Sequence, residues 1–348
     1  MTTRKMTRKE RMRRRRRRRI RNTILLLVLL VGLAAGGVGA IYLIQNGGLF
    51  SGINEPYLAS REFEDTLSSR ENLRAEAFAK NLCVVEGDVA LENVTLGEDQ
   101  KGVLLNLDNK SVLYAKEPFA RVYPASITKI MTAMLALKYG NMDETVTITQ
   151  ENVTLEEGSQ VCGFQAGDRL TMDQLLRCLL VYSGNDAASA IAEHVGGTME
   201  NFVSMMNSYA AQLGCTGTHF SNPHGLQDEN HYTTTYDIYL MLKEALNYPE
   251  FTQITQLSSY TVEYTRADGT PVSTVLDATD HYLTGEATAP KNVTILGGKT
   301  GTTSNAGNCL ALLSQNAFGK PFVSIVMGAA TKEDLYQQMN SLLQNINQ

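Results

Sequence analysis

The sequence predicts an α/β (α+β) domain, in which a mainly antiparallel sheet flanked by helices lies beside an all-helical lobe, behind an N-terminal transmembrane helix. Strand-like apolar runs occur near residue 110 and again after residue 290, whereas apolar residues recur at three- and four-residue intervals in between. A basic tail followed at once by an uncharged segment predicts the membrane helix. With 348 residues, 43% of them hydrophobic, the chain can bury a core, which excludes a wholly disordered protein.

Residues 1–23 are predicted to form a cytoplasmic basic tail, and residues 24–44 a helix that crosses the cell membrane once. Residues 1–21 hold thirteen Lys or Arg and one Glu, a charge of +12, so the rest of the chain carries −17. As a helix, residues 24–44 would span about 31 Å, the thickness of a hydrocarbon core. Because basic flanks stay inside the cell, the acidic remainder is expected outside and no nucleic-acid partner is expected. A signal peptide cleaved after Val38-Gly39-Ala40 is the alternative.

Residues 45–80 are predicted to be a linker or stalk, and residues 81–348 the folded domain. A hairpin is expected from strands at 103–107 and 112–115, joined by the turn composition Asp108-Asn109-Lys110. Helical periodicity then runs from Ser126 to Tyr139. Further helices are expected at 171–182, 186–195, 198–213 and 233–247, strands at 293–296, 310–313 and 322–327, and a last helix from 332. A cleft where the sheet meets the helical lobe is the expected site.

Ser126 and Lys129 are the first candidate catalytic residues, because a helix that starts at Ser126 places both side chains on one face. A serine hydroxyl is a weak nucleophile until a neighbour accepts its proton. An amine does so once its pKa falls from about 10.4 toward neutrality, through burial or a nearby cation. The spacing S-x-x-K alone is common, so the prediction needs further motifs.

Two further motifs complete a known catalytic set. Ser183-Gly184-Asn185 separates two helical patterns, where a hydroxyl and an amide can face a cleft. Lys299-Thr300-Gly301 ends the strand pattern that begins at 293, where a cation, a hydroxyl and a glycine edge can meet an extended peptide. S-x-x-K, an S-x-N element and K-T-G occur in this order in penicillin-recognising serine enzymes.

The chain therefore resembles the low-molecular-weight penicillin-binding proteins, the serine D-alanyl-D-alanine carboxypeptidases. The stretches that carry the resemblance are Pro124 to Thr132, Ser183 to Ala188, Asn222-Pro223-His224-Gly225-Leu226 and Lys299 to Thr303, and it covers roughly residues 81–331. It implies a penicillin-binding/β-lactamase-like transpeptidase fold. It also implies removal of the terminal D-alanine from peptidoglycan stem pentapeptides, inhibition by β-lactam antibiotics, a role in cell-wall remodelling, and no cofactor or metal.

The resemblance assigns a role to each motif residue. Ser126 forms the acyl-enzyme, Lys129 is its base, and Ser183 relays a proton to the leaving amine. Asn185 holds the peptide chain, Lys299 keeps the cleft positive, and Gly301 lines the strand edge. Thr300 and Thr302 meet the substrate carboxylate, and the N–H groups of Ser126 and Thr302 form the oxyanion hole. The segment Asp277 to Lys291 lacks the Asn- and Arg-rich approach to K-T-G of better-known members.

Three other functions fit parts of the sequence. A serine β-lactamase shares two motifs but needs a well-placed Glu, and the nearest match, Glu244-Ala245-Leu246-Asn247, falls inside a helical pattern. A zinc peptidase would use His219, His224 and His231, which lie in a loop-rich segment without the helical H-x-x-x-H spacing. A membrane-anchored wall sensor would keep the fold without turnover.

Overall fold

The computed structural model describes residues 12, 13, 15–28 and 81–347, and the chain divides into two compact units, Met1–Phe78 and Ala79–Gln348. In the first unit, residues 15–28 are helical and exposed. The predicted linker 45–80, and the predicted membrane helix from position 29 onward, lie outside the described residues. Among the helices that are described, none combines the length and apolar character needed to cross a bilayer.

A five-stranded antiparallel sheet in the order β2-β1-β9-β8-β7 forms the centre of the second unit. It joins the predicted hairpin to the strands of the C-terminal third, which confirms one sheet built from distant segments. The strands are longer than the apolar runs predicted, because pairing continues through polar and glycine positions. They are β1 (Lys101–Asn106), β2 (Ser111–Lys116), β7 (Thr294–Thr303), β8 (Gly307–Gln315) and β9 (Pro321–Ala329).

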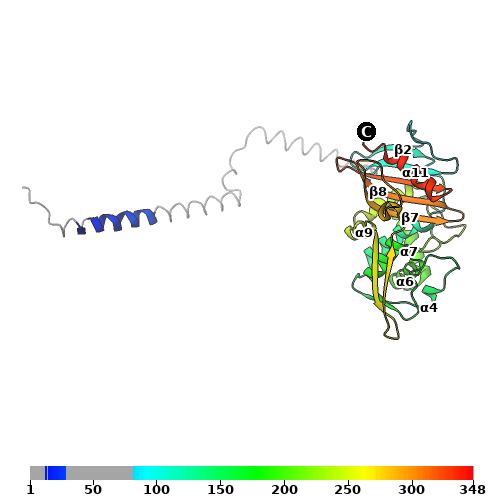
Figure 1. Ribbon diagram of the computed structural model, residues 1–348, viewed down its shortest axis with the longest axis horizontal. Coiled ribbons are helices and arrows are strands. Elements are labelled where there is room, and N and C mark those ends of the chain that lie inside the picture. Colours follow the sequence, from blue (N-terminus) through cyan, green and yellow to red (C-terminus); the bar gives the residue numbers. More distant parts are fainter. Residues whose placement is uncertain (1–11, 14, 29–80, 348) are drawn as a thin grey trace, which may run out of the picture. The chain divides into compact units, whose positions relative to one another are not determined.

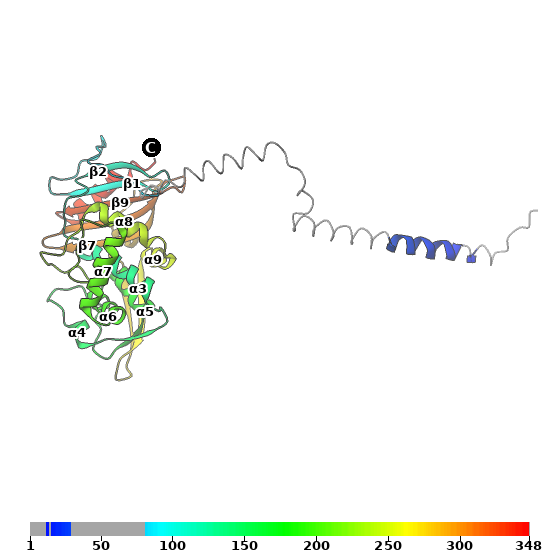
Figure 2. The ribbon, with the colours of Figure 1, turned by 180° about the vertical axis from the view of Figure 1, so that it is seen from behind.

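Helices cover both faces of this sheet. The C-terminal helix α11 (Lys332–Leu343) packs on β8 and β9 with the apolar face Leu335, Met339 and Leu342 (Figure 1). Seen from behind, α8 (Thr235–Ala245) lies against the opposite face, where it contacts β1, β8 and β9 (Figure 2). Strand β7 pairs only with β8 among the described strands, so its outer edge is open to the neighbouring lobe.

The neighbouring lobe contains the predicted helices. They are α3 (Lys129–Tyr139), α5 (Met172–Arg177) continued by the π-helix η2 (Cys178–Tyr182), α6 (Asn185–Gly196) and α7 (Met199–Leu213). The predicted helix from Ser126 begins as the 3-10 turn η1 (Ala125–Thr128). Three short helices were not predicted: α4 (Gln150–Val153), α9 (Pro249–Thr255) and α10 (His281–Thr284).

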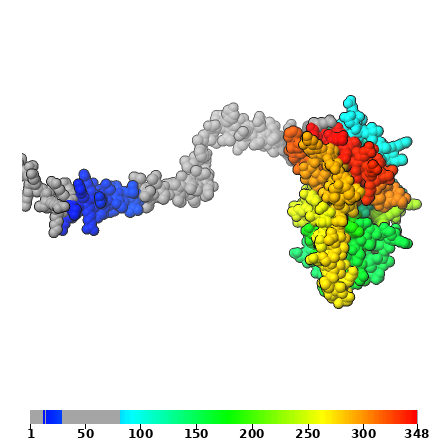
Figure 3. All heavy atoms as spheres, viewed as in Figure 1, coloured from blue at the N-terminus to red at the C-terminus, as the bar shows by residue number. Residues whose placement is uncertain are grey.

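The prediction that this lobe is all-helical was wrong. A second sheet in the order β3-β4-β5-β6 forms part of it. Its long hairpin, whose segment is yellow in Figure 3, makes a continuous ridge on the visible face. Only alternate residues of that hairpin are buried, which keeps its apolar signal weak, and the other two strands have three residues each. The strands are β3 (Thr145–Thr147), β4 (Arg169–Thr171), β5 (Ser259–Thr265) and β6 (Pro271–Asp277).

A buried carboxylate at the start of α6 holds the loop before β4. Asp186 is 1% exposed and accepts hydrogen bonds from the backbone N–H groups of Cys162 and Gly163, at 3.0 Å each, and of Phe164 at 3.4 Å. The N–H of Asn185 donates to the carbonyl of Gln160 at 2.7 Å. Negative charge is favourable at a helix N-terminus, so the same carboxylate stabilises both elements.

We expect Asp186→Ala to lower the free energy of unfolding by about 3 kcal/mol, because it leaves three loop N–H groups without their charged acceptor. Asp186→Asn keeps one acceptor oxygen and should lose less. Urea unfolding followed by circular dichroism measures both variants. An alanine variant as stable as the parent chain would contradict this account of the loop.

Candidate active site

Ser126 lies in the 3-10 turn η1, directly after a strained residue. Ala125 has φ +47°, a left-handed conformation that costs a non-glycine residue about 1–3 kcal/mol. The hydroxyl of Thr128 donates to the carbonyl of Ala125 at 2.8 Å, and Gly225 packs on the same carbonyl so closely that a Cβ there would overlap it. The turn that presents Ser126 is therefore fixed from two sides.

A buried histidine supports this turn. Nδ1 of His231 accepts from the N–H of Ser221 at 3.0 Å, so the ring proton resides on Nε2, which lies 2.7 Å from the hydroxyl of Thr128. Burial lowers the pKa of His231 to about 4, which keeps the ring neutral. His231 thus positions the strained turn through Thr128, a role that the sequence did not indicate.

Lys129 is fully buried beside Ser126 and has three polar neighbours. Its Nζ lies 2.8 Å from Oγ of Ser126, 2.7 Å from Oδ1 of Asn185 and 2.8 Å from the carbonyl oxygen of His224. A neutral amine has two protons and one lone pair. Since the amide oxygen and the carbonyl oxygen accept both protons, the lone pair is directed at Oγ of Ser126, ready to receive its proton.

The surroundings of Lys129 favour that neutral form. Burial lowers the pKa of Lys129 well below its usual 10.5, and the positive charge of Lys299 lowers it further. An uncharged amine at this position accepts a proton from a hydroxyl near neutral pH. This arrangement can therefore activate the hydroxyl of Ser126 as a nucleophile.

Ser183 and Lys299 form a second contact, and Ser183 lines the same cleft as Ser126. Ser183 ends the π-helix η2 in a left-handed conformation, φ +69°, which turns its side chain out of the helix. Nζ of Lys299 donates to Oγ of Ser183 and to the carbonyl of Thr300, at 3.0 Å each. Lys299 is 1% exposed, and burial lowers its pKa to about 7, although the carboxylate of Asp280 opposes this shift.

The Lys299-Thr300-Gly301 motif lies inside β7, which continues to Thr303. The prediction that the motif ends the strand was wrong, because the pairing of β7 with β8 continues as far as Thr303 and Gly307. A Cβ on Gly301 would approach the backbone nitrogen of Ser126 to 3.0 Å, so glycine lets the strand edge reach the serine turn. Oγ1 of Thr300 lies 2.5 Å from Oγ1 of Thr279, and the hydroxyl of Thr302 donates to Oδ1 of Asn308 at 3.2 Å.

Two clefts meet at Ser126. The α11 cleft, of about 190 Å³, is lined by Ser126, Ser183, Thr279, Thr300, Gly301, Thr302 and Lys332, among others. The α6 cleft, of about 170 Å³, is lined by Ser126, Asn185, His224, Leu226, Thr302 and Thr303, among others. Ser126, Gln160 and Thr302 border both. A peptide can therefore lie on both sides of the serine along the edge of β7.

All eight predicted site residues are thus brought to one place, and several neighbours were not foreseen. Gln160, Thr279 and Lys332 line the clefts from loops and a helix whose sequences carry no catalytic motif. Lys332 supplies a cation where the sequence offered no Arg before K-T-G. Lys332 reaches the site because it is the first residue of α11, which packs on β8.

The three histidines weighed for zinc do not converge on one point. Nδ1 of His219 contacts the carbonyl of Asn230, Nδ1 of His224 accepts from the N–H of Leu226, and both nitrogens of His231 are engaged as described. Within the described residues, no group of three or more His, Cys, Asp or Glu side chains is placed to hold a metal ion.

Comparison with known proteins places the chain in a family. A sequence model described as D-alanyl-D-alanine carboxypeptidase matches residues 97–331. The D-alanyl-D-alanine carboxypeptidase DacF of Bacillus subtilis is 34% identical over 251 residues, and DacA of Haemophilus influenzae is 31% identical over 257 residues. These alignments cover 71% and 70% of this chain and 61% of each relative, so the chain spans about three fifths of the length of those relatives.

Solved structures agree in fold. The DD-transpeptidase of Streptomyces K15 superposes with a TM-score of 0.65 at 25% sequence identity, covering 70% of this chain and 94% of that one. This similarity supports the penicillin-binding type of fold that the motifs implied. Residues 97–331, which the sequence model matches, contain the serine turn, the Ser183-Gly184-Asn185 junction and strand β7. The chain therefore belongs to the D-alanyl-D-alanine carboxypeptidase family of low-molecular-weight penicillin-binding proteins.

Proposed function

We propose that this protein is a serine D-alanyl-D-alanine carboxypeptidase that removes the terminal D-alanine from peptidoglycan stem pentapeptides. One observation carries the proposal: the amine of buried Lys129 lies 2.8 Å from Oγ of Ser126, while its protons have acceptors in Asn185 and His224. Family membership supplies the substrate class. The names of the relatives support the same reaction.

The first half of the reaction forms an acyl-enzyme. Lys129 Nζ takes the hydroxyl proton of Ser126 as Oγ bonds to the carbonyl carbon of the penultimate D-alanine. The N–H groups of Ser126 and Thr302 donate to the oxyanion, each worth about 3–4 kcal/mol in other acyl-transfer enzymes. The C–N bond then breaks: Ser183 gives its hydroxyl proton to the leaving amine and receives in return the proton that Lys129 took from Ser126, while Lys299 donates to the hydroxyl of Ser183. Water hydrolyses the ester and restores Ser126.

The two clefts fit the two parts of the substrate. The departing D-alanine occupies the α11 cleft, where its carboxylate meets the hydroxyls of Thr300 and Thr302 and the cation Lys332. The acyl part lies in the α6 cleft beside the amide of Asn185. β-Lactam antibiotics would acylate the same serine, because they present a reactive carbonyl and a carboxylate to the same groups.

A location at the outer side of the cell membrane suits this substrate. The basic tail 1–23 and the apolar segment 24–44 would anchor the chain with its N-terminus in the cytoplasm, as a single-pass membrane protein. The domain after residue 80 would then work on the cell wall. Cell-wall remodelling is the resulting physiological role.

Replacing the nucleophile should abolish both reactions of this site. The parent chain is expected to be labelled by a fluorescent penicillin and to release D-alanine from a pentapeptide ending in D-Ala-D-Ala. Ser126→Ala should lose both signals, because no other group can form the ester. The exposed serine variant Ser273→Ala is the control and should retain both. Labelling of the parent without any release of D-alanine would contradict the proposal and favour a wall sensor.

The charge of Lys299 should shift the pH below which acylation slows. The rate should fall as the pH drops through the pKa of Lys129, because the protonated amine cannot accept a proton. The charge of Lys299 depresses that pKa, so Lys299→Met should raise it and move the acidic limb of penicillin acylation to higher pH. Lys299→Arg keeps the charge and should leave the limb in place. If the acidic limb of the Lys299→Met variant lay at the same pH as that of the parent chain, the charge of Lys299 would have no effect on the pKa of Lys129, and this account would be refuted.

The cation at the rim of the α11 cleft should act on substrate binding. Lys332→Met should raise KM for the pentapeptide about tenfold, ~1.4 kcal/mol, with kcat little changed, because the carboxylate pairs equally in ground and transition states. A pentapeptide whose terminal carboxylate is an amide should show no such effect. Steady-state kinetics on both peptides measures the difference, and an equal loss on the two would exclude a role in carboxylate recognition.

A further inference from the structure

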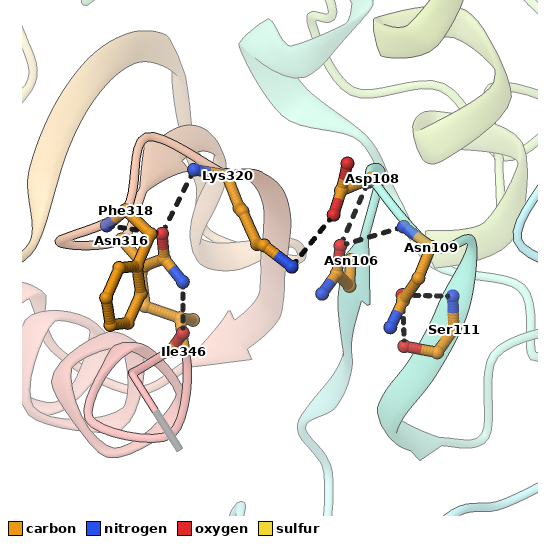
Figure 4. Close-up of polar contacts among 8 residues, drawn as sticks. All are labelled: Asn106, Asp108, Asn109, Ser111, Asn316, Phe318, Lys320 and Ile346. Atoms are coloured by element: carbon orange, nitrogen blue, oxygen red, sulfur yellow. Dashed lines mark hydrogen bonds and ion pairs between the residues drawn. The ribbon is translucent and has the colours of Figure 1, made fainter.

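A second cavity lies at the far end of the central sheet from Ser126. It has a volume of about 330 Å³ and lies between the β1–β2 turn, the β8–β9 turn and the residues that follow α11 (Figure 4). Asn308 and Cys309 of β8 line the α11 cleft, whereas Asn316, just beyond the other end of β8, lines this cavity. At about 3.4 Å per residue, seven residues of strand separate the two sites by about 24 Å.

Two asparagines shape the turns that border this cavity. Oδ1 of Asn106 accepts from the N–H groups of Asp108 and Asn109, at 2.9 and 3.3 Å. Oδ1 of Asn316 accepts from the N–H groups of Phe318 and Lys320, at 3.0 Å each. These bonds fix both turns locally, so the walls of the cavity are set before any ligand arrives.

The amide nitrogen of Asn106 has no such partner. The residue is 8% exposed and borders the cavity, and none of the described residues accepts a hydrogen bond from its Nδ2. Figure 4 shows this nitrogen directed into the space between the two turns. This nitrogen therefore offers a donor to a ligand that brings an oxygen to this point.

The rest of the lining combines apolar side chains with the amides of Asn109, Asn316 and Asn345 and the ammonium of Lys320. Phe318 is 80% exposed at the rim, and Leu113, Phe322 and Ile346 contribute apolar surface. The ammonium of Lys320 pairs with the carboxylate of Asp108 at 3.0 Å, so the cation is already neutralised. An exposed ring, planar amide donors and an apolar wall together suit a neutral ring that has both hydroxyls and C–H faces.

We propose that this cavity binds an N-acetylated amino-sugar of the cell-wall glycan. The acetamido oxygen accepts from Nδ2 of Asn106, its methyl group contacts the apolar wall, and Phe318 stacks on the C–H face of the pyranose ring. The volume lies near the lower end of the range of about 300–1,000 Å³ for small-molecule sites. The choice of glycan rests on the proposed function, because that substrate is attached to the same polymer.

A sugar site on the same rigid sheet would hold the enzyme on its polymer. Binding of a glycan strand raises the effective concentration of nearby stem peptides at Ser126, without any new contact in the catalytic clefts. The benefit exists only for polymeric wall. Short soluble peptides would be hydrolysed equally well with or without this cavity.

Titration of the full-length protein with the trimer of β-1,4-linked N-acetylglucosamine tests the proposal, since that probe contains no peptide. The parent chain should bind it, and calorimetry should show at least a fivefold weaker affinity for Phe318→Ala and for Asn106→Asp, which keeps the turn acceptor but loses the donor. Phe119→Ala, which removes another exposed phenylalanine, is the matched control and should bind as the parent does. All three variants should hydrolyse a soluble pentapeptide normally.

Two results would overturn the sugar site. One is the absence of trimer binding by the parent chain at millimolar concentrations. The other is unchanged affinity in Phe318→Ala, because that exposed side chain can be removed without disturbing the core. Loss of D-alanine release in the parent chain would instead count against the proposed function, so the two failures are distinguishable.

Discussion

The chemistry proposed for this protein depends on keeping one lysine amine uncharged beside one serine hydroxyl. Lys129 is fully buried, and a second buried cation, Lys299, opposes its protonation. An ammonium with three donors and an amine with a lone pair need different neighbours. The two oxygen acceptors from Asn185 and His224 satisfy the amine and leave its lone pair for Ser126. Burial alone would lower the pKa, but these acceptors give the resulting base its direction.

Such an arrangement requires segments that are distant in sequence to meet at close range. The serine turn, the end of the π-helix and the middle of β7 each carry one motif, and two of them contain a non-glycine residue with positive φ, Ala125 and Ser183. Conformations of this kind persist only where the surroundings hold them. Thr128, His231 and Gly225 do so at the first turn, while pairing with β8 holds β7 beside it. The strain is thereby concentrated at the two hydroxyls that are proposed to transfer protons.

Much of the fold and the motif residues of the site could be predicted from the sequence, because both have local signals. The helical periodicity and the hairpin composition near Asp108-Asn109 depend on neighbouring residues alone. The second sheet was missed because β3 and β4 have only three residues each, and because the hairpin of β5 and β6 buries too few side chains to give an apolar pattern. Lys332 and His231 were not foreseen as parts of the site, since only tertiary packing brings them near Ser126. Sequence spacing predicts contacts within one element, whereas contacts between elements need a family resemblance or the structure.

The two ends of the central sheet differ in how they are built, and this difference bears on their functions. At the catalytic end, side chains from three segments hold one another in place, so a change in one affects the rest. At the other end, Asn106 and Asn316 fix their own turns through bonds within four residues. Local bonding of this kind leaves the surface there independent of the catalytic geometry. The side chains that line the distal cavity can therefore be replaced without altering the pKa of Lys129. The proposed sugar site and the catalytic site can then change independently of each other.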